Sequence, residues 1–211
     1  MRRATALLAA ALLLGGCAGR GLLPAPEAGE AARFFQASAM GGFSYPAMSS
    51  FSGVVEAGGE VYPFVAGVNA QSDADEKVGL FDPLGHVVML IAGDGATITL
   101  TAGPAAGPLA PLGGKKAPAE GLSLGRILWG APGYPVGQGE FRRAGDGGWE
   151  FSDGRQTLRT DPGRRFIAAA DYKVAGRSLA VAYPGRALAT PPGLLKLVVL
   201  DARIELRRDI E

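Results

Sequence analysis

The chain of 211 residues has little of what metal sites, disulfides and acid–base catalysis require, because it contains one cysteine and one histidine. A disulfide needs two cysteines, and a structural zinc site needs several Cys or His ligands, so both are excluded. An excess of charge of one sign is also lacking, since the chain has 21 basic and 20 acidic residues. We therefore expect no nucleic-acid partner, no metal, no cofactor and no enzyme activity.

Glycine and proline, by contrast, are abundant, with 33 and 15 residues, and 47% of the chain is hydrophobic. This hydrophobic share is enough to build a core, so disorder is excluded. So many turn-forming residues favour short strands joined by turns over long helices.

The N-terminus has the pattern of an export signal. Met1, Arg2 and Arg3 precede an apolar run, Ala4 to Leu14, which is too short to cross a bilayer. The sequence Leu-Gly-Gly-Cys that ends at Cys17 resembles the lipobox of bacterial lipoproteins. This resemblance implies a signal peptide at residues 1–16 and a lipid anchor on Cys17; residues 17–26 are then a lipidated tether to a single domain, residues 27–211. A secretory signal that happens to contain a cysteine is the alternative.

Residues 27–40 are predicted to form one helix. Glu27 and Glu30 stand near its start, where negative charge suits the helix dipole, and Phe34 and Phe35 belong to its apolar side. Gly41 and the following glycine are expected to end it.

From residue 50 onward, apolar and polar residues alternate with a period of two, as in half-buried antiparallel strands. The clearest case is the final segment, residues 194–206, which we interpret as one closing strand. The predicted fold class is mainly β (α+β): about ten strands form a strongly curved antiparallel sheet, or half-open barrel. Glycine-containing turns are expected at residues 57–59, 82–85, 93–95, 145–148, 153–154 and 161–163.

Two segments interrupt this alternation. Gly103 to Gly121 is rich in Gly, Pro and Ala and is predicted to be a loop. Leu122 to Trp129 follows as a short apolar capping helix, for which the concave side of the sheet is the expected place. Two interpretations remain open for five aromatic residues, which either line an apolar ligand pocket or fill the core: Trp129, Phe141, Trp149, Phe151 and Phe166.

Candidate polar sites are weak. Asp73, Asp75 and Glu76 lack the glycine and the distal glutamate of a calcium loop, so a solvated hairpin turn is the better interpretation. A hydrolase would have to use His86, which follows a tight turn; no serine of the chain has nucleophile-elbow glycines around it. A surface histidine is the favoured interpretation, and the hydrolase is a third, weaker hypothesis.

Residues 78–91 carry a more specific resemblance. A strand that ends in Asp82, Pro83, Leu84 and Gly85 and returns as an apolar strand looks like the central segment of the LolB family of outer-membrane lipoprotein receptors. The segment around Trp129 resembles that family's short Trp-containing helix, residues 148–151 its late Gly-Trp strand, and residues 194–206 its closing strand.

The resemblance implies a barrel whose apolar cavity accepts the acyl chains of lipoproteins and helps to insert lipoproteins into the outer membrane. It implies a membrane-contacting loop at Pro83, Leu84 and Gly85, although Leu84 folded back onto the sheet is the alternative. Our candidates for the acyl cavity are Phe34, Leu122, Ile127, Leu128, Trp129, Trp149 and Phe151.

The expected protein is therefore a monomer, held by lipid on the periplasmic side of the outer membrane of a Gram-negative bacterium. Lipoprotein acyl chains are its expected ligand, and a LolA-type periplasmic carrier is a candidate partner. The competing hypothesis is a structural or assembly lipoprotein of the envelope with the same fold, filled by its own side chains, which binds a protein partner. A continuous apolar cavity would favour the first hypothesis and a solid interior the second.

Overall fold

The computed structural model describes residues 21–40, 43–57, 59–184, 193–199 and 202–208. The predicted signal peptide and Cys17 lie outside these residues, so the anchor hypothesis stays a prediction. Within them, no helix combines the length and the hydropathy that crossing a membrane requires.

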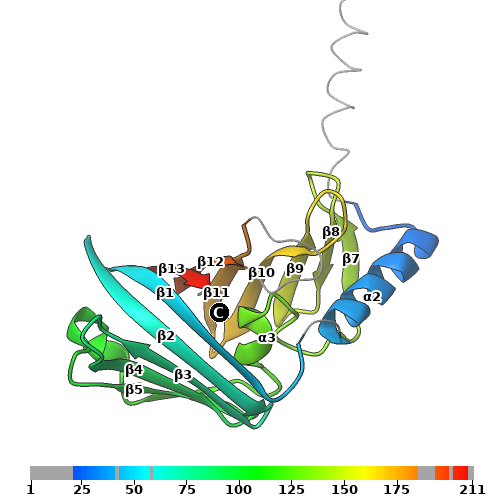
Figure 1. Ribbon diagram of the computed structural model, residues 1–211. Coiled ribbons are helices and arrows are strands. Elements are labelled where there is room, and N and C mark those ends of the chain that lie inside the picture. Colours follow the sequence, from blue (N-terminus) through cyan, green and yellow to red (C-terminus); the bar gives the residue numbers. More distant parts are fainter. Residues whose placement is uncertain (1–20, 41–42, 58, 185–192, 200–201, 209–211) are drawn as a thin grey trace, which may run out of the picture.

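The described residues form one antiparallel sheet of thirteen strands, with a helix at each of two places along it (Figure 1). The strands are β1 (Ala47–Ala57), β2 (Glu60–Ser72), β3 (Asp75–Phe81), β4 (Val87–Gly93), β5 (Thr97–Ala102), β6 (Lys115–Pro118), β7 (Glu140–Arg143), β8 (Trp149–Ser152), β9 (Gln156–Thr160), β10 (Ile167–Val174), β11 (Arg177–Ala182), β12 (Leu194–Val199) and β13 (Ala202–Arg208).

Most neighbours in the sheet are consecutive in the chain, as in a meander, and β1 pairs with β13 to join the two halves. The sheet is not closed, because β6 and β7 are its two edges. The predicted class is confirmed, and so are the predicted turns that lie wholly within the described residues, but the predicted strand number is too low. Residue 58, in the predicted turn at 57–59, lies outside the described residues. Edge strands are often charged or carry proline, which limits pairing with other chains. Lys115, Lys116 and Pro118 in β6, and three charged residues in β7, hide both strands from a pattern search.

Two segments differ from the prediction. The segment 103–121 is not simply a loop: it contains the 3₁₀ helix η1 (Gly107–Leu112) and β6. The segment 194–206 is not one strand but the hairpin β12–β13, in which Leu195 faces Leu206 and Leu197 faces Ile204. The hairpin places all four of these side chains on the same face, which a single straight strand could not do because its side chains alternate.

Helix α2 (Ala25–Met40) confirms the predicted helix and begins two residues earlier. It covers β7 and β8 through an aromatic cluster, in which the ring centroids of Phe35 and Phe151 are 5.8 Å apart. Residues 21–26, predicted as tether, are part of this unit. Leu22 forms a β-bridge with Arg142, and the Leu23 amide donates to the Phe141 carbonyl at 3.0 Å. Pairing to the open edge of β7 satisfies backbone groups that a free tether would leave to water.

The short helix α3 (Leu124–Leu128) confirms the predicted capping helix and its position on the concave side (Figure 1). The alternation along β2 separates the two faces of the sheet. Phe64, Ala66 and Val68 are buried on the concave face, whereas Val61 and Val65 are exposed on the convex one. The core and the space for a site therefore lie between the concave face and α3.

Candidate functional site

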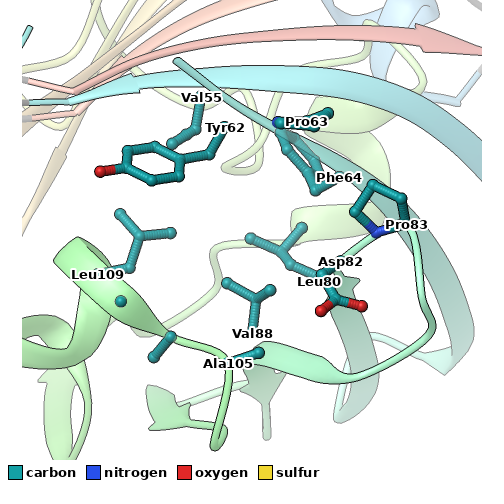
Figure 2. A pocket seen from close by; sticks show the side chains of 12 residues that line it. Val55, Tyr62, Pro63, Phe64, Leu80, Asp82, Pro83, Val88, Ala105 and Leu109 are labelled. Atoms are coloured by element: carbon teal, nitrogen blue, oxygen red, sulfur yellow. The ribbon is translucent and has the colours of Figure 1, made fainter. Parts of the chain in front are cut away.

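An apolar cavity of about 280 Å³ lies at the end of the sheet where the turn after β3 meets η1, and we call it the outer cavity (Figure 2). Tyr62 and Phe64 reach it from β2, Leu80 from β3 and Leu109 from η1. Its complete lining is Val55, Tyr62, Pro63, Phe64, Leu80, Asp82, Pro83, Val88, Ala105, Ala106, Gly107 and Leu109.

A second cavity of about 150 Å³, the inner cavity, lies under α3. Its lining is entirely apolar and comprises Phe51, Ala66, Val68, Val78, Leu80, Ile91, Leu124, Ile127, Leu128, Leu179, Leu197, Ile204 and Leu206. Leu80 lines both cavities, so they lie next to one another along the concave face. An apolar lining offers no hydrogen-bond partners to water, and enclosed apolar cavities of roughly this volume bind small apolar molecules.

Helix α3 is held over the inner cavity by a buried carboxylate. Glu76 of β3 is 2% exposed and accepts hydrogen bonds from the Ser123 hydroxyl at 2.6 Å, the Leu124 amide at 2.6 Å and the Gly125 amide at 3.2 Å. The Tyr45 hydroxyl donates to the same carboxylate at 2.8 Å, and burial raises the pKa of Tyr45 to about 12. The prediction of a solvated turn is therefore wrong for Glu76, because strand alternation points it inward while Lys77 points outward.

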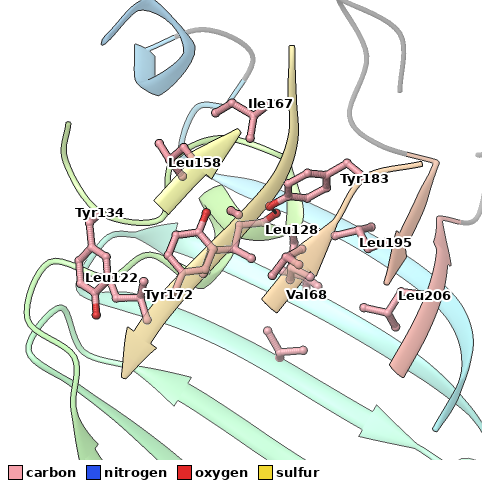
Figure 3. Close-up of a cluster of buried hydrophobic side chains, with 14 of the residues drawn as sticks. Val68, Leu122, Leu128, Tyr134, Leu158, Ile167, Tyr172, Tyr183, Leu195 and Leu206 are labelled. Atoms are coloured by element: carbon pink, nitrogen blue, oxygen red, sulfur yellow. Dashed lines mark hydrogen bonds between the residues drawn. The ribbon is translucent and has the colours of Figure 1, made fainter. Parts of the chain in front are cut away.

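Close approach explains the glycine inside α3. A Cβ on Gly125 would lie 2.6 Å from the Phe43 ring and 3.0 Å from the Glu76 carboxylate. On the other side of α3, the Tyr183 hydroxyl donates to the Ile127 carbonyl at 2.8 Å. Figure 3 shows Tyr183 in one cluster of buried side chains with Leu128 of α3. The helix is thus fixed from both halves of the sheet.

The turn at Pro83, Leu84 and Gly85 is adjacent to the outer cavity, because Pro83 is one of its lining residues. The Asp82 carboxylate accepts hydrogen bonds from the Leu84 amide at 2.9 Å and the His86 amide at 2.8 Å, and Gly85 has a φ of 87° that favours glycine. Leu84 itself is 82% exposed, so it does not fold back onto the sheet.

No protein-family profile matches the chain. No curated protein matches it either. The fold is similar to that of a LolA superfamily protein from Nitrosomonas europaea. That crystal structure matches with a TM-score of 0.46 and 11% sequence identity, over 85% of this chain and 91% of the other.

The structure separates the predicted acyl-cavity residues into different environments. Ile127 and Leu128 line the inner cavity, and the other five lie outside the lining of both cavities. Leu122 is buried in the core, and Trp129 packs against Phe43 with ring centroids 5.3 Å apart.

The remaining three candidates, Phe34, Trp149 and Phe151, belong to the aromatic cluster under α2. The Trp149 indole donates to the Glu27 carboxylate at 3.1 Å, and this bond with those of Arg143 lowers the pKa of Glu27. These side chains hold α2 on the sheet.

His86 has one side-chain partner among the described residues. Its Nδ1 lies 2.9 Å from the Asp82 Oδ2, and the His86 side chain is 62% exposed. A carboxylate is therefore within reach, as a hydrolase would need, but no serine hydroxyl is among the hydrogen-bond partners that the described residues provide. The Asp82–His86 pair closes the turn, and it lowers the pKa of Asp82.

Several lining residues were missed at the sequence level, and an alternating pattern was the signal that could have found them. Tyr62, Phe64, Ala66 and Val68 alternate along β2 as clearly as any segment of the chain. Their shared cavity depends on the pairing of β2 with β1 and β3, which alternation alone does not specify. Within the described part of the chain, no group of three or more His, Cys, Asp or Glu residues could hold a metal ion.

Proposed function

We propose that this protein is a lipid-anchored carrier of the bacterial outer membrane, which binds lipoprotein acyl chains non-covalently and helps to insert lipoproteins into that membrane. The observation that carries the proposal is the pair of neighbouring apolar cavities that share Leu80 as a lining residue, the outer of which borders the turn of Leu84. The lipobox at Cys17 supports the anchor, and the resemblance to the LolB family supports the role.

The size and lining of the cavities suit a flexible hydrocarbon chain. Ligand pockets in proteins span roughly 300 to 1,000 Å³, and the outer cavity with its inner neighbour falls near the lower end of that range. Each methylene removed from water contributes about 0.8 kcal/mol, so a chain that fills both cavities binds much more tightly than one that fills the outer cavity alone.

Transfer then follows from relative affinity. No bond is made or broken, so the acyl chain leaves the protein when the bilayer buries it better than the cavity does. The outer cavity is next to Leu84, an exposed apolar side chain on a turn braced by Pro83 and Asp82. Such a side chain can enter the boundary of a bilayer and bring the cavity close to it.

The structural or assembly hypothesis has one specific observation in its favour. On the convex face, Val61, Val65 and Leu90 are 62%, 42% and 44% exposed, so this face offers apolar side chains that a protein partner could cover. A protein partner that covers these residues would leave the cavities unused, and the following experiment separates the two hypotheses.

Filling the outer cavity tests the carrier function. Ala105 lines this cavity and is half-buried, so Ala105→Phe adds a ring at the rim with little disturbance of the core. Ala92→Phe is the matched control, because Ala92 is exposed on β4 and outside the lining of both cavities. We expect Ala105→Phe to weaken binding of a fluorescent acyl probe at least ten-fold, while Ala92→Phe binds it like the wild type.

Equal binding by both variants would contradict a ligand site in the outer cavity. Absence of binding by the wild-type protein would overturn the carrier function and leave the partner-binding hypothesis.

A further inference from the structure

Arg208 continues the row of side chains that forms one wall of the inner cavity. Ile204 and Leu206 of β13 both line this cavity, and Arg208 is the next residue of the same face. Across the sheet it pairs with Phe51 of β1, which is fully buried and also lines the cavity. The apolar wall therefore ends in a guanidinium group.

This guanidinium is held rigidly. It stacks between two aromatic rings, 4.6 Å from the centroid of Phe51 and 4.4 Å from that of Trp129. One nitrogen donates to the Leu128 carbonyl at 3.3 Å, and another donates to the Ser49 hydroxyl. Both neighbours are neutral acceptors, so they orient the group without cancelling its charge.

No carboxylate of the described residues forms an ion pair with Arg208, and its Nε is buried without a hydrogen-bond partner there. Its neighbour Arg207 points to the other face and pairs with Glu205 at 3.2 Å. Loss of water lowers the pKa of Arg208 to about 10, and no charge of the described residues opposes this shift. A desolvated cation without a counter-ion is costly, and proteins normally pair such a group.

We propose that Arg208 is a head-group site for an anionic acyl ligand, with a carboxylate or phosphate on Arg208 and the chain of that ligand along Leu206 in the inner cavity. A planar guanidinium matches both anions with parallel hydrogen bonds, and Nε is a donor that the described residues leave without a partner. The inference rests on the proposed acyl binding and adds a second class of ligand, because the acylated end of a lipoprotein carries no such charge.

Probes that share one hydrocarbon chain test this inference. Palmitate, hexadecyl phosphate and neutral hexadecanol are titrated calorimetrically into the purified protein. We expect both anions to bind at least ten-fold more tightly than hexadecanol, and the tighter of the two distinguishes a fatty acid from a phospholipid as the source. This comparison uses the wild-type protein and does not depend on a variant that folds.

Variants then locate the effect. Arg208→Gln should reduce the affinity for both anions to that for hexadecanol and leave hexadecanol binding unchanged. Arg207→Gln is the matched control and should bind all three probes like the wild type. Hexadecanol binding as tight as that of palmitate, or equal losses for charged and neutral probes in Arg208→Gln, would overturn the head-group site while acyl binding stands. Failure of all three probes to bind would overturn both proposals.

Discussion

Leu84 is the residue at which sequence and structure agree on an unusual environment. A leucine that is 82% exposed gains nothing from burial in the folded chain, and its turn is fixed by the Asp82 carboxylate instead. Removal of the Leu84 side chain should therefore affect contacts with other molecules more than it affects folding.

Leu84→Glu should change the free energy of unfolding by no more than about 0.5 kcal/mol, because the side chain is outside the core. It should slow the transfer of a bound acyl probe to phosphatidylcholine vesicles, since a carboxylate does not enter the apolar boundary. Thermal melts and a fluorescence transfer assay measure the two effects. Met48→Glu is the control, because Met48 is 75% exposed near the start of β1 and lies outside the lining of both cavities. This variant should transfer the probe normally. A large loss of stability in Leu84→Glu would mean that Leu84 is a core residue.

Asp94, in the turn between β4 and β5, gives the free energy of unfolding its clearest dependence on pH. Hydrogen bonds from the Thr97 hydroxyl and amide and from the Ala96 amide lower the pKa of Asp94 to about 2. The folded state therefore binds this proton more weakly than the unfolded state, whose pKa is about 3.9. The stabilisation is complete above the unfolded value and is lost as the pH falls through the folded value.

We accordingly expect the difference in unfolding free energy between the wild type and Asp94→Asn to be constant above about pH 5 and to shrink toward pH 2. Urea unfolding at a series of pH values measures it. Thr97→Val removes the hydrogen bond of the Thr97 hydroxyl, which is the largest single cause of the lowered pKa of Asp94. This variant should therefore show a weaker dependence of the unfolding free energy on pH. A free-energy difference between the two proteins that grows as the pH falls would contradict the lowered pKa of Asp94.

At the scale of elements, α3 is too short to be stable alone and depends on its contacts with the sheet. Glu76 connects β3 to its first turn, and Tyr183 connects the other half of the sheet to its end. The helix covers the inner cavity, so the Glu76 contacts determine whether that cavity is closed.

Glu76→Gln should leave one or more buried donors at the start of α3 unsatisfied, at a cost of about 1 to 3 kcal/mol. We expect lower thermal stability together with faster amide hydrogen exchange at residues 123–128. Asp75→Asn is the control, because Asp75 forms a surface ion pair with Lys77 and such pairs contribute little. Equal changes in both variants would show that α3 does not depend on Glu76.

At the scale of the whole molecule, the open sheet separates two regions. One edge, β7, pairs with residues 21–23 and is covered by α2 (Figure 1). The outer cavity lies among β1 to β4 and η1, and the inner cavity extends across to β11, β12 and β13. The predicted anchor at Cys17 precedes the first of these regions in the chain.

Cys17→Ala should abolish labelling of the protein by radioactive palmitate in cells and move it from the membrane fraction to the soluble fraction. The thiol is the only one in the chain, so no second site can take the label. His86→Ala, which changes the other unique side chain, is the control and should be labelled normally. Persistent labelling of Cys17→Ala would contradict the lipid anchor.

How much the sequence determined depends on the range of the interactions involved. Turn glycines, the N-terminal helix and the short helix near residue 124 follow from local preferences, and the sequence predicted all three. The edge strands β6 and β7 escaped because charge and proline hide the alternation that defines a strand.

The site was predicted less completely than the fold, for a physical reason. The expected place of the short apolar helix on the concave side puts Ile127 and Leu128 at the inner cavity, as the structure shows, but Trp149 and Phe151, predicted for the same cavity, pack under α2 instead. Only the tertiary structure decided that β1 pairs with β13, and this pairing places Phe51 against Arg208. Contacts between residues far apart in the chain depend on strand pairing, which no local pattern encodes. The sequence by itself determined a curved, turn-rich sheet with one thiol, and the tertiary structure decided where the sheet leaves room for a ligand.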